Sequence, residues 1–253
     1  MRTAIIYNHK GGCSKTVTAI NFADNLAGRG YQVLVVDMDP QGNASSFFRR
    51  YNINKTSVRE LLTGEVRPSR CRYRTNYKGI DIIPSSLGLR AVTSDALVAG
   101  RDTLKEGLWD ISDKYDYCII DCPPSVDFLT EVIMATADDV VIPLKPDRFS
   151  SDGLWTVMDL VYNFGPEDVA VRGLFTQFYR NKDTFASIRN ITETSGVPVY
   201  DNVIRRCSAV DHSILVRRPL AKCASKSTAA QDYRDFTEEY LEWVKEVKED
   251  GIA

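Results

Sequence analysis

Short apolar runs alternate with longer amphipathic segments along most of the chain. The apolar runs are rich in valine and isoleucine and lack strict alternation, which is typical of strands buried on both faces. They lie at residues 3–7, 32–39, 80–86, 115–124, 138–144 and 169–178. Because helical crossovers join such strands, the pattern predicts an α/β fold: a doubly wound, mostly parallel sheet flanked by helices.

Three segments carry a helical pattern. We expect one helix from Lys15 to about Gly28, a helical pair through residues 87–113, and a long helix near the C-terminus. In the last segment, apolar residues recur at spacings of three and four, at Ala229, Tyr233, Phe236, Tyr240, Val244 and Val247. Its outer face is acidic, whereas helices that lie on membrane surfaces are typically rich in lysine and arginine, so we expect it to pack on the body of the protein.

The length of 253 residues suits one α/β domain, and we expect residues 1–253 to form it, with no helix-turn-helix domain before the first strand. No apolar run approaches the roughly 20 residues that a membrane span needs. The N-terminal apolar run is too short for a secretory signal. These features predict a cytoplasmic protein that does not cross a membrane.

Six cysteines are scattered along the chain without a CxxC pair, so we expect reduced thiols rather than a zinc or redox site. Cys118 and Cys122 lie within and after an apolar run, where cysteine most often acts as a small buried hydrophobic residue.

The net charge of −2 is unevenly distributed. Residues 232–250 carry a net charge of −5, so the rest of the chain carries +3. Positive charge gathers in two segments: residues 67–78 hold five bases and no acid, and residues 205–226 hold six bases against one acid. Each segment is explained either by solvated surface charge or by binding to a polyanion.

The run from the first strand into the first helix has the context of a phosphate-binding loop. A strand is followed by a turn with glycines and by a helix that begins at Lys15, so backbone N–H groups converge where phosphate oxygens bind. Lys15 would reach the β- and γ-phosphates, and Thr16 would ligate magnesium. The pattern GxxxxGK[ST] is broken at His9 and Ser14, and an additional lysine, Lys10, precedes the two glycines.

Two further segments place carboxylates at predicted strand ends. "VLVVDMDPQGN" offers Asp37 and Asp39, which can hold the water shell of a metal ion or orient an attacking water. "YDYCIIDCPPS" is an apolar strand that ends in Asp121, the arrangement of a Walker B aspartate that holds magnesium. Three phosphate-site elements in this order indicate a nucleotide site far more strongly than the loop alone.

The segments "KGGCSKT", "DMDPQGN", "DCPPS" and "ADDVVIPLKPDRFSSDGL" resemble the ParA family of partition ATPases, within the wider deviant-Walker P-loop group that includes MinD. The resemblance extends from residue 3 to about residue 245. It implies a P-loop NTPase fold that uses ATP and Mg²⁺.

The resemblance also implies roles for single residues. Lys15 would act on the nucleotide of its own subunit, while Lys10, the signature lysine, would reach across a two-fold sandwich dimer to the partner's nucleotide. Lys10, Lys15 and Asp39 would be catalytic, and Thr16, Asp39 and Asp121 would serve the metal. The nucleotide-binding residues implied are Lys10, Gly11, Gly12, Cys13, Ser14, Lys15, Thr16, Val17 and, on the side of the base, Thr176.

The chain departs from the family pattern in two places. A glycine usually occupies the position of Ser14, so the serine side chain is expected to crowd the phosphates and slow hydrolysis unless its hydroxyl points outward or bonds to phosphate. Residues 204–219, which align with a stretch that contributes to base contacts and DNA binding in the family, keep little of its sequence. We assign DNA binding to four arginines, Arg205, Arg206, Arg217 and Arg218, and rank the basic segment 67–78 second.

These features together predict an ATPase that forms a homodimer on ATP, binds DNA without sequence preference and is released after hydrolysis stimulated by a ParB-like partner. Such a protein would be nucleoid-associated and would segregate a plasmid or a chromosome. The alternatives are a MinD-like positioning ATPase, which would need a basic C-terminal helix, and a nucleotide-binding switch with little turnover because of Ser14.

Overall fold

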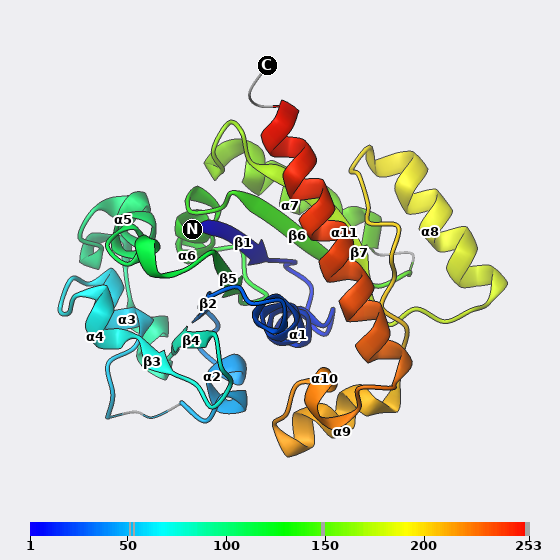
Figure 1. The fold of residues 1–253 in the computed structure, drawn as a ribbon. Helices are drawn as coiled ribbons and strands as arrows, with labels where there is room; N and C mark the ends of the chain where they lie inside the picture. Colours follow the sequence, from blue (N-terminus) through cyan, green and yellow to red (C-terminus); the bar gives the residue numbers. More distant parts are fainter. Residues whose placement is uncertain (51, 53, 148–149, 251–253) are drawn as a thin grey trace.

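A seven-stranded sheet runs through the computed structural model, which describes residues 1–50, 52, 54–147 and 150–250 (Figure 1). The strand order is β3-β4-β2-β5-β1-β6-β7, and all neighbours are parallel except the edge strand β3. The strands are β1 (Arg2–Ile6), β2 (Val33–Asp37), β3 (Tyr73–Arg74), β4 (Ile80–Ile83), β5 (Tyr117–Asp121), β6 (Asp139–Leu144) and β7 (Ala170–Phe175). This confirms the predicted doubly wound α/β fold.

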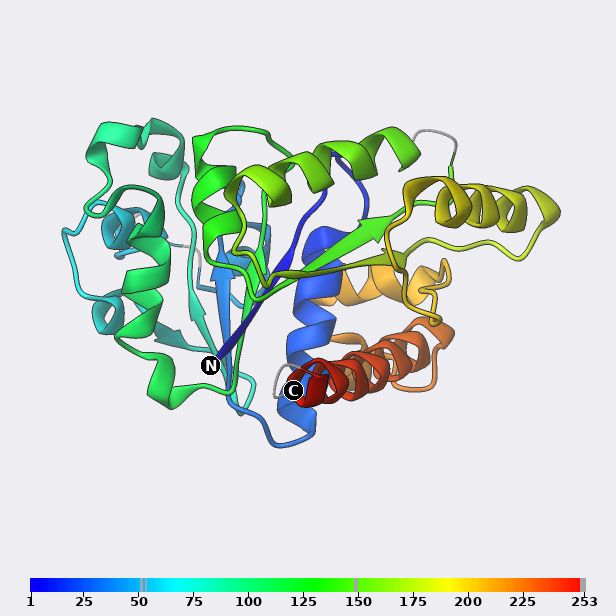
Figure 2. The same ribbon diagram turned by 90° about the horizontal axis from the view of Figure 1, so that it is seen from above.

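Helices cover both faces of the sheet. The α-helices are α1 (Lys15–Gly28), α2 (Asn43–Phe47), α3 (Val58–Leu62), α4 (Pro68–Cys71), α5 (Thr103–Trp109), α6 (Phe128–Ala135), α7 (Ser150–Phe164), α8 (Lys182–Ser195), α9 (Ser208–Val216), α10 (Leu220–Cys223) and α11 (Thr228–Asp250). Figure 2 shows α6 and α7 on one face, and α1 and α11 on the other. Side chains alternate along β1 accordingly, with Ile5 in the core beneath α6 and α7 and Ile6 in the core beneath α1 and α11.

The predicted helical pair through residues 87–113 is wrong. This stretch holds one α-helix, α5, among short 3₁₀ helices, namely η1 (Leu87–Ala91), η2 (Ser94–Ala96), η3 (Gly100–Asp102) and η4 (Ser112–Lys114). Val92 and Leu97 adopt extended backbone conformations and Gly100 has φ 58°. These conformations interrupt the i→i−4 hydrogen bonding that a continuous helix requires.

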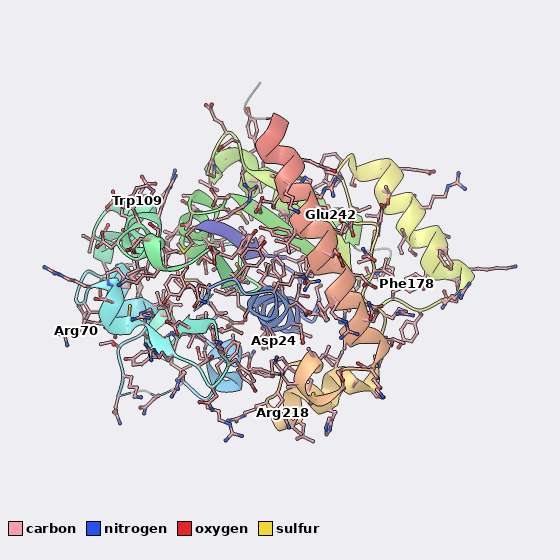
Figure 3. All side chains as sticks on the ribbon, in the orientation of Figure 1. Asp24, Arg70, Trp109, Phe178, Arg218 and Glu242 are labelled. Atoms are coloured by element: carbon pink, nitrogen blue, oxygen red, sulfur yellow. The ribbon has the colours of Figure 1, made fainter. Side chains whose placement is uncertain are left out.

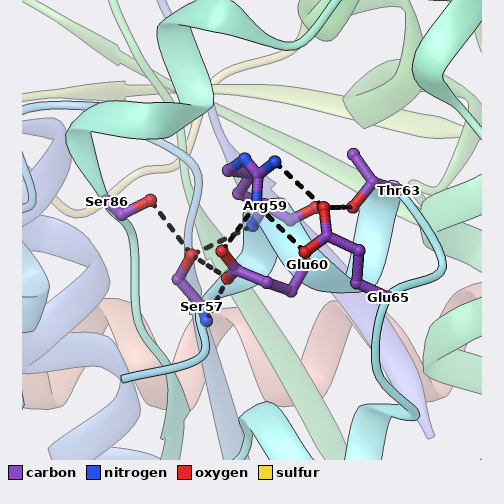
Figure 4. Close-up of polar contacts among 6 residues, drawn as sticks. All are labelled: Ser57, Arg59, Glu60, Thr63, Glu65 and Ser86. Carbon is purple, nitrogen blue, oxygen red and sulfur yellow. Dashed lines mark hydrogen bonds and ion pairs between the residues drawn. The ribbon is translucent and has the colours of Figure 1, made fainter. Parts of the chain in front are cut away.

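A capping box starts α3 and fixes it to the sheet (Figure 4). The Ser57 backbone N–H donates to Glu60 Oε2 at 2.6 Å, while Ser57 Oγ accepts from the Arg59 N–H at 3.2 Å. Such reciprocal bonds satisfy N–H groups that a helix start leaves free. Because the Val58 N–H also donates to Pro84 O at 2.8 Å, the start of α3 lies against the end of β4.

The C-terminal helix packs on the body, as predicted from its apolar spacing. Tyr233, Phe236 and Tyr240 of α11 are fully buried, and the Phe22 ring of α1 contacts Phe236 with ring centroids 5.1 Å apart. Cys118 and Cys122 are also buried, which confirms their reading as small hydrophobic residues. Across the described residues, no helix is both long and apolar enough to cross a bilayer, and no group of three or more His, Cys, Asp or Glu side chains is placed to hold a metal ion.

A buried carboxylate ties the first strand to the last helix. Asp139, at the start of β6, is fully buried and accepts hydrogen bonds from Arg2 Nε and from Tyr240 Oη, each at 2.6 Å. Arg2 also forms an ion pair with Asp139 at 2.6 Å. A buried charge with these partners is satisfied, whereas loss of any one partner leaves part of it uncompensated.

We predict that Tyr240→Phe lowers the free energy of unfolding by about 1.5–3 kcal/mol, because the carboxylate of Asp139 loses a charge-assisted hydrogen bond. The control is Arg189→Ala, which breaks the exposed ion pair of α8 with Glu193 and should leave the free energy of unfolding almost unchanged, because solvent screens the pair. Urea unfolding of both variants measures the two costs. Equal losses would contradict the role given to the buried tyrosine.

Candidate nucleotide site

The three motifs meet because their strands are neighbours. In the order β2-β5-β1, Asp121 at the end of β5 pairs with Ile6 of β1 on one side and with Asp37 of β2 on the other. The carboxyl ends of these three strands are therefore level. Ligands of doubly wound sheets bind beyond such strand ends, so the loop before α1 and the carboxylates of β2 and β5 face one site.

The lysine at the start of α1 closes the loop that precedes it. Lys15 Nζ donates to Asn8 O at 2.8 Å and to Lys10 O at 2.9 Å. Only 8% of Lys15 is exposed, and burial lowers the pKa of its ammonium group. The amine is thus held at the centre of the loop, where it can meet phosphate oxygens that lie against the loop N–H groups.

Two side chains beneath the loop fix its path. Asn8 Nδ2 donates to Pro143 O at 2.9 Å, and Asn8 Oδ1 accepts from the Lys10 N–H at 2.9 Å. Thr176, which follows β7, is fully buried, and its hydroxyl donates to Cys13 O at 3.2 Å. The structure therefore places Thr176 as a support of the loop, in contact with its backbone.

Ser14 adopts a left-handed conformation with φ 67°, the backbone geometry that glycine tolerates at no cost. Its hydroxyl accepts a hydrogen bond from Gln177 Nε2 at 3.0 Å, and the same amide donates to Gly12 O at 2.7 Å. Gln177 itself has φ 55°. The amide of Gln177 thus bridges two loop residues and holds the serine hydroxyl.

Lys10 packs against α7, and its ammonium nitrogen is buried. A Cβ atom added to Gly153 would come within 3.3 Å of Lys10 Cε, so the glycine lets the lysine stem lie close against the helix. His9 lies beside the same glycine, and burial followed by the charge of Lys10 lowers the pKa of its imidazole. The two lysines of the motif therefore differ in their contacts, since Lys15 bonds to carbonyl groups of the loop and the stem of Lys10 lies against α7.

The carboxylates differ in how they are held. Asp37 accepts from the Ser45 N–H at 2.7 Å and the Ser45 hydroxyl at 2.6 Å, which fix it in place. Asp39 accepts from the Gln41 N–H at 2.8 Å. Burial and then the charge of Asp37 raise the pKa of the Asp121 carboxyl well above its usual range.

Asp121 fits a magnesium site. It is fully buried, and within the described residues neither of its carboxylate oxygens has a partner in hydrogen-bonding geometry, although Thr16 is near enough to lower its pKa. A buried carboxylate without donors is costly unless a cation compensates it. Oxygen ligands from Asp121 and Thr16, with Asp39 nearby, match the hard-donor preference of Mg²⁺.

A pocket of about 520 Å³ opens beside the loop, which is within the size range of small-molecule sites. Ser14, Val17 and Gln177 line one side, and Arg206 and Ile214 are among the residues that line the other. The predicted nucleotide-binding residue Val17 therefore lies at this pocket, next to the phosphate-binding loop.

Sequence reasoning missed three residues of the site, namely Asn8, Lys145 and Gln177. Lys145 follows β6, and its Nζ would lie 3.5 Å from a Cβ atom added to Gly12. Asn8 and Lys145 each follow directly after a predicted strand, at residues 3–7 and 138–144. The rule that ligands bind at the carboxyl ends of strands would therefore have selected both residues. Gln177 carries no such signal, because its role depends on the left-handed backbone.

The four arginines assigned to DNA binding do not share one environment. Arg205 donates through Nε and its backbone N–H to Asp232 of α11, at 3.0 and 2.8 Å, so its charge is already paired. Arg206 stacks over the Tyr179 ring, 5.3 Å from its centroid. Arg217 and Arg218 are exposed at the other end of α9, and Figure 3 shows Arg218 at the edge of the molecule.

A mostly parallel sheet with a lysine-closed loop after β1 and carboxylates at the ends of β2 and β5 defines a P-loop NTPase of the deviant Walker type. Residues 1–168 match the family described as AAA domain. The chromosome partitioning protein ParA of Caulobacter vibrioides is 30% identical over 252 residues, which cover 95% of this chain and 94% of that protein. The chromosome-partitioning ATPase Soj of Treponema pallidum is 30% identical over 248 residues, covering 95% and 97%.

The cobyrinic acid a,c-diamide synthase of Mycobacterium smegmatis, solved with bound ADP and magnesium, is 27% identical with a TM-score of 0.83, covering 97% of this chain and 96% of that one. The chain belongs to the ParA/Soj family of P-loop NTPases, as its motifs predicted.

We predict that Gln177→Ala weakens the binding of a fluorescent ATP analogue about 3- to 10-fold, because the loop loses two hydrogen bonds of about 1 kcal/mol each in a partly solvated setting. Ser14→Gly should cost little by itself and should restore much of the affinity in the double variant, since glycine needs no support at φ 67°. If the loss of binding free energy in the double variant equals the sum of the losses in the two single variants, the two residues act independently.

Proposed function

We propose that this protein is an ATPase that binds ATP with Mg²⁺ and hydrolyses it as part of a cycle that positions DNA. One observation carries the proposal. The loop that Lys15 closes, Asp39 and Asp121 lie at the carboxyl ends of three adjacent strands, which end at the same height in the sheet. The M. smegmatis neighbour with ADP and magnesium and the names of ParA and Soj support it. The continuous sheet supports a single domain over residues 1–253.

Each residue of the site has a distinct task in this proposal. The loop N–H groups and Lys15 bind and orient the phosphates, and Asp121 with Thr16 would hold Mg²⁺. The metal ion, when bound, neutralises charge that develops on the transferred phosphoryl group. Asp39 orients the attacking water and accepts its proton, because its charge acts on both Lys15 and Asp121 and so lies within this site.

Lys10 is proposed to act in a dimer. Its stem lies against Gly153 of α7, and a rotation of this long side chain away from the helix would carry the ammonium group to phosphate oxygens of a second subunit. A cation beside clustered phosphate charges is stabilised far more than a cation in water, so ATP would become part of the interface.

We further propose that the ATP-bound dimer binds DNA without sequence preference, carries a plasmid or a chromosome, and releases it when a ParB-like partner stimulates hydrolysis. Nucleoid association would follow from this DNA binding. The acidic outer face of α11 does not favour a MinD-like membrane role, because membrane-surface helices are typically basic. The alternative of a switch with little turnover depends on Ser14 crowding the phosphates. The hydrogen bond from Gln177 to the Ser14 hydroxyl argues against this alternative.

We predict that Lys15→Ala abolishes ATP binding, whereas Lys10→Ala leaves a monomer that still binds ATP and cannot form the dimer. Equilibrium binding of a fluorescent ATP analogue and light scattering measure the two properties. Lys182→Ala, an exposed lysine of α8, is the matched control and should change neither. Equal loss of ATP binding in both loop variants would overturn this division of labour.

We predict that Asp39→Ala lowers the rate of hydrolysis by about 10²- to 10⁴-fold while ATP still drives dimerisation, since the water-orienting group is lost and the phosphate loop remains. Phosphate release, measured with and without DNA, tests this, and light scattering shows whether the dimer persists. Turnover equal to that of the unmodified protein would remove Asp39 from the mechanism.

A further inference from the structure

A tyrosine joins two basic segments that are far apart in the sequence. Tyr77, in the turn between β3 and β4, donates its hydroxyl to Arg217 O at the end of α9, at 3.0 Å. Residues 67–78 and 205–226, each notable for its positive charge, therefore meet at this contact. They are parts of one surface.

A third segment, at the end of α2, extends the same surface. Arg50 Nε donates to Arg74 O at 2.7 Å, which ties residue 50 to the edge strand β3. The Phe48 ring contacts the Tyr77 ring, with centroids 5.9 Å apart. In Figure 1, α2, the β3–β4 turn and α9–α10 lie along one side of the molecule. We call the six bases of these three segments the Tyr77 surface: Arg49, Arg50, Arg74, Lys78, Arg217 and Arg218.

The positive charge of this surface is largely unopposed. Five of its six bases are exposed, and Arg50 is half-buried. The acids nearby have partners of their own, since Asp81 accepts from Arg72 and from Tyr115 Oη at 2.8 Å, and the buried Asp24 lies 3.9 Å from Lys222. The charge of the surface thus faces solvent.

The surface is grooved on both sides of the turn at residues 75–79. One hollow, of about 420 Å³, is lined in part by Arg74, Lys78 and Lys114. The other, of about 620 Å³, is lined in part by Lys78, Tyr77 and Lys222. Both hollows share Tyr77 and Lys78, and bases line each of them together with one acid, Asp81 in the first and Asp24 in the second.

We propose that the Tyr77 surface is where this chain binds the phosphate backbone of duplex DNA, with residues 49–50 and 74–78 contributing alongside Arg217 and Arg218. The inference rests on the proposed function, because it presumes DNA binding and locates it. Backbone contacts come from lysine and arginine spread over several elements. A protein partner would instead need aromatic or apolar anchors. The exposed Ile214 and Leu215 of α9 lie beside Arg217 and could serve as such anchors, but the six bases outnumber them and favour a polyanion.

Binding of a fluorescent duplex, measured with ATP and Mg²⁺ over a series of salt concentrations, tests the proposal. One variant combines Arg49→Glu, Arg74→Glu and Lys78→Glu, and a second combines Arg217→Glu and Arg218→Glu. The matched control, Lys105→Glu, Lys182→Glu and Lys245→Glu, makes the same change in net charge as the first variant, on α5, α8 and α11, and its first two changes alone match the second variant. A milder set, with Gln at residues 49, 74 and 78, guards against misfolding, and all variants should keep ATP-analogue binding.

We expect both surface variants to lose at least 10-fold in affinity, and the control to stay within about 2-fold after correction for net charge. The slope of log affinity against log salt should fall by about 0.9 for each phosphate contact removed, including in the Gln set. Normal affinity and slope in the variants of residues 49, 74 and 78, with loss only at Arg217 and Arg218, would overturn the inference and leave the proposed function standing. If the unmodified protein binds no duplex at low salt, or binds only RNA or an acidic protein, the DNA-binding function itself is overturned, and the inference with it.

Discussion

The site depends on one buried ammonium group. Lys15 Nζ bonds to the carbonyl groups of Asn8 and Lys10, so the loop between β1 and α1 has its shape before any phosphate arrives. Burial of a charge is costly, and here two carbonyl oxygens offset the cost only in part. An anion placed in the loop would complete the compensation. The same group therefore organises the loop and favours phosphate within it.

The rest of the loop is arranged around that lysine. Thr176 supports it from β7, Asn8 connects it to β6, and Gln177 holds Ser14 in a conformation that serine rarely adopts. A left-handed serine costs of order 1 kcal/mol, which the amide of Gln177 is well placed to offset. Residues at the ends of β6 and β7 thus support the nucleotide loop, although neither strand carries one of the three phosphate-site motifs.

The sequence predicts the parts of this structure that depend on repeating patterns and on strand ends. The strands, α1 and α11 follow from apolar spacing, and the convergence of Lys15, Asp39 and Asp121 follows from strand order in a doubly wound sheet. The region of residues 87–113 was predicted wrongly, because isolated extended residues break a helix without altering the average pattern.

Contacts set by the tertiary fold were beyond reach from sequence. One such contact is the pairing of Arg205 with Asp232. Another is the hydrogen bond between Tyr77 and Arg217, which brings together segments 140 residues apart. Neither pair has a spacing or composition that marks it. The two basic segments could be ranked against each other from sequence, but only the fold shows that they adjoin.

The contacts of α11 bear on how the protein is made. This helix follows α1 by about 200 residues, yet it covers α1, where Phe22 packs on Phe236 and Thr18 shares a hydrogen bond of 3.1 Å with Tyr233, 215 residues away. Ribosomes synthesise the chain from its N-terminus, so N-terminal segments emerge first. Contacts between distant segments form only after both segments have emerged. The helix that carries Lys15 therefore stays without this cover until residues 228–250 have emerged from the ribosome.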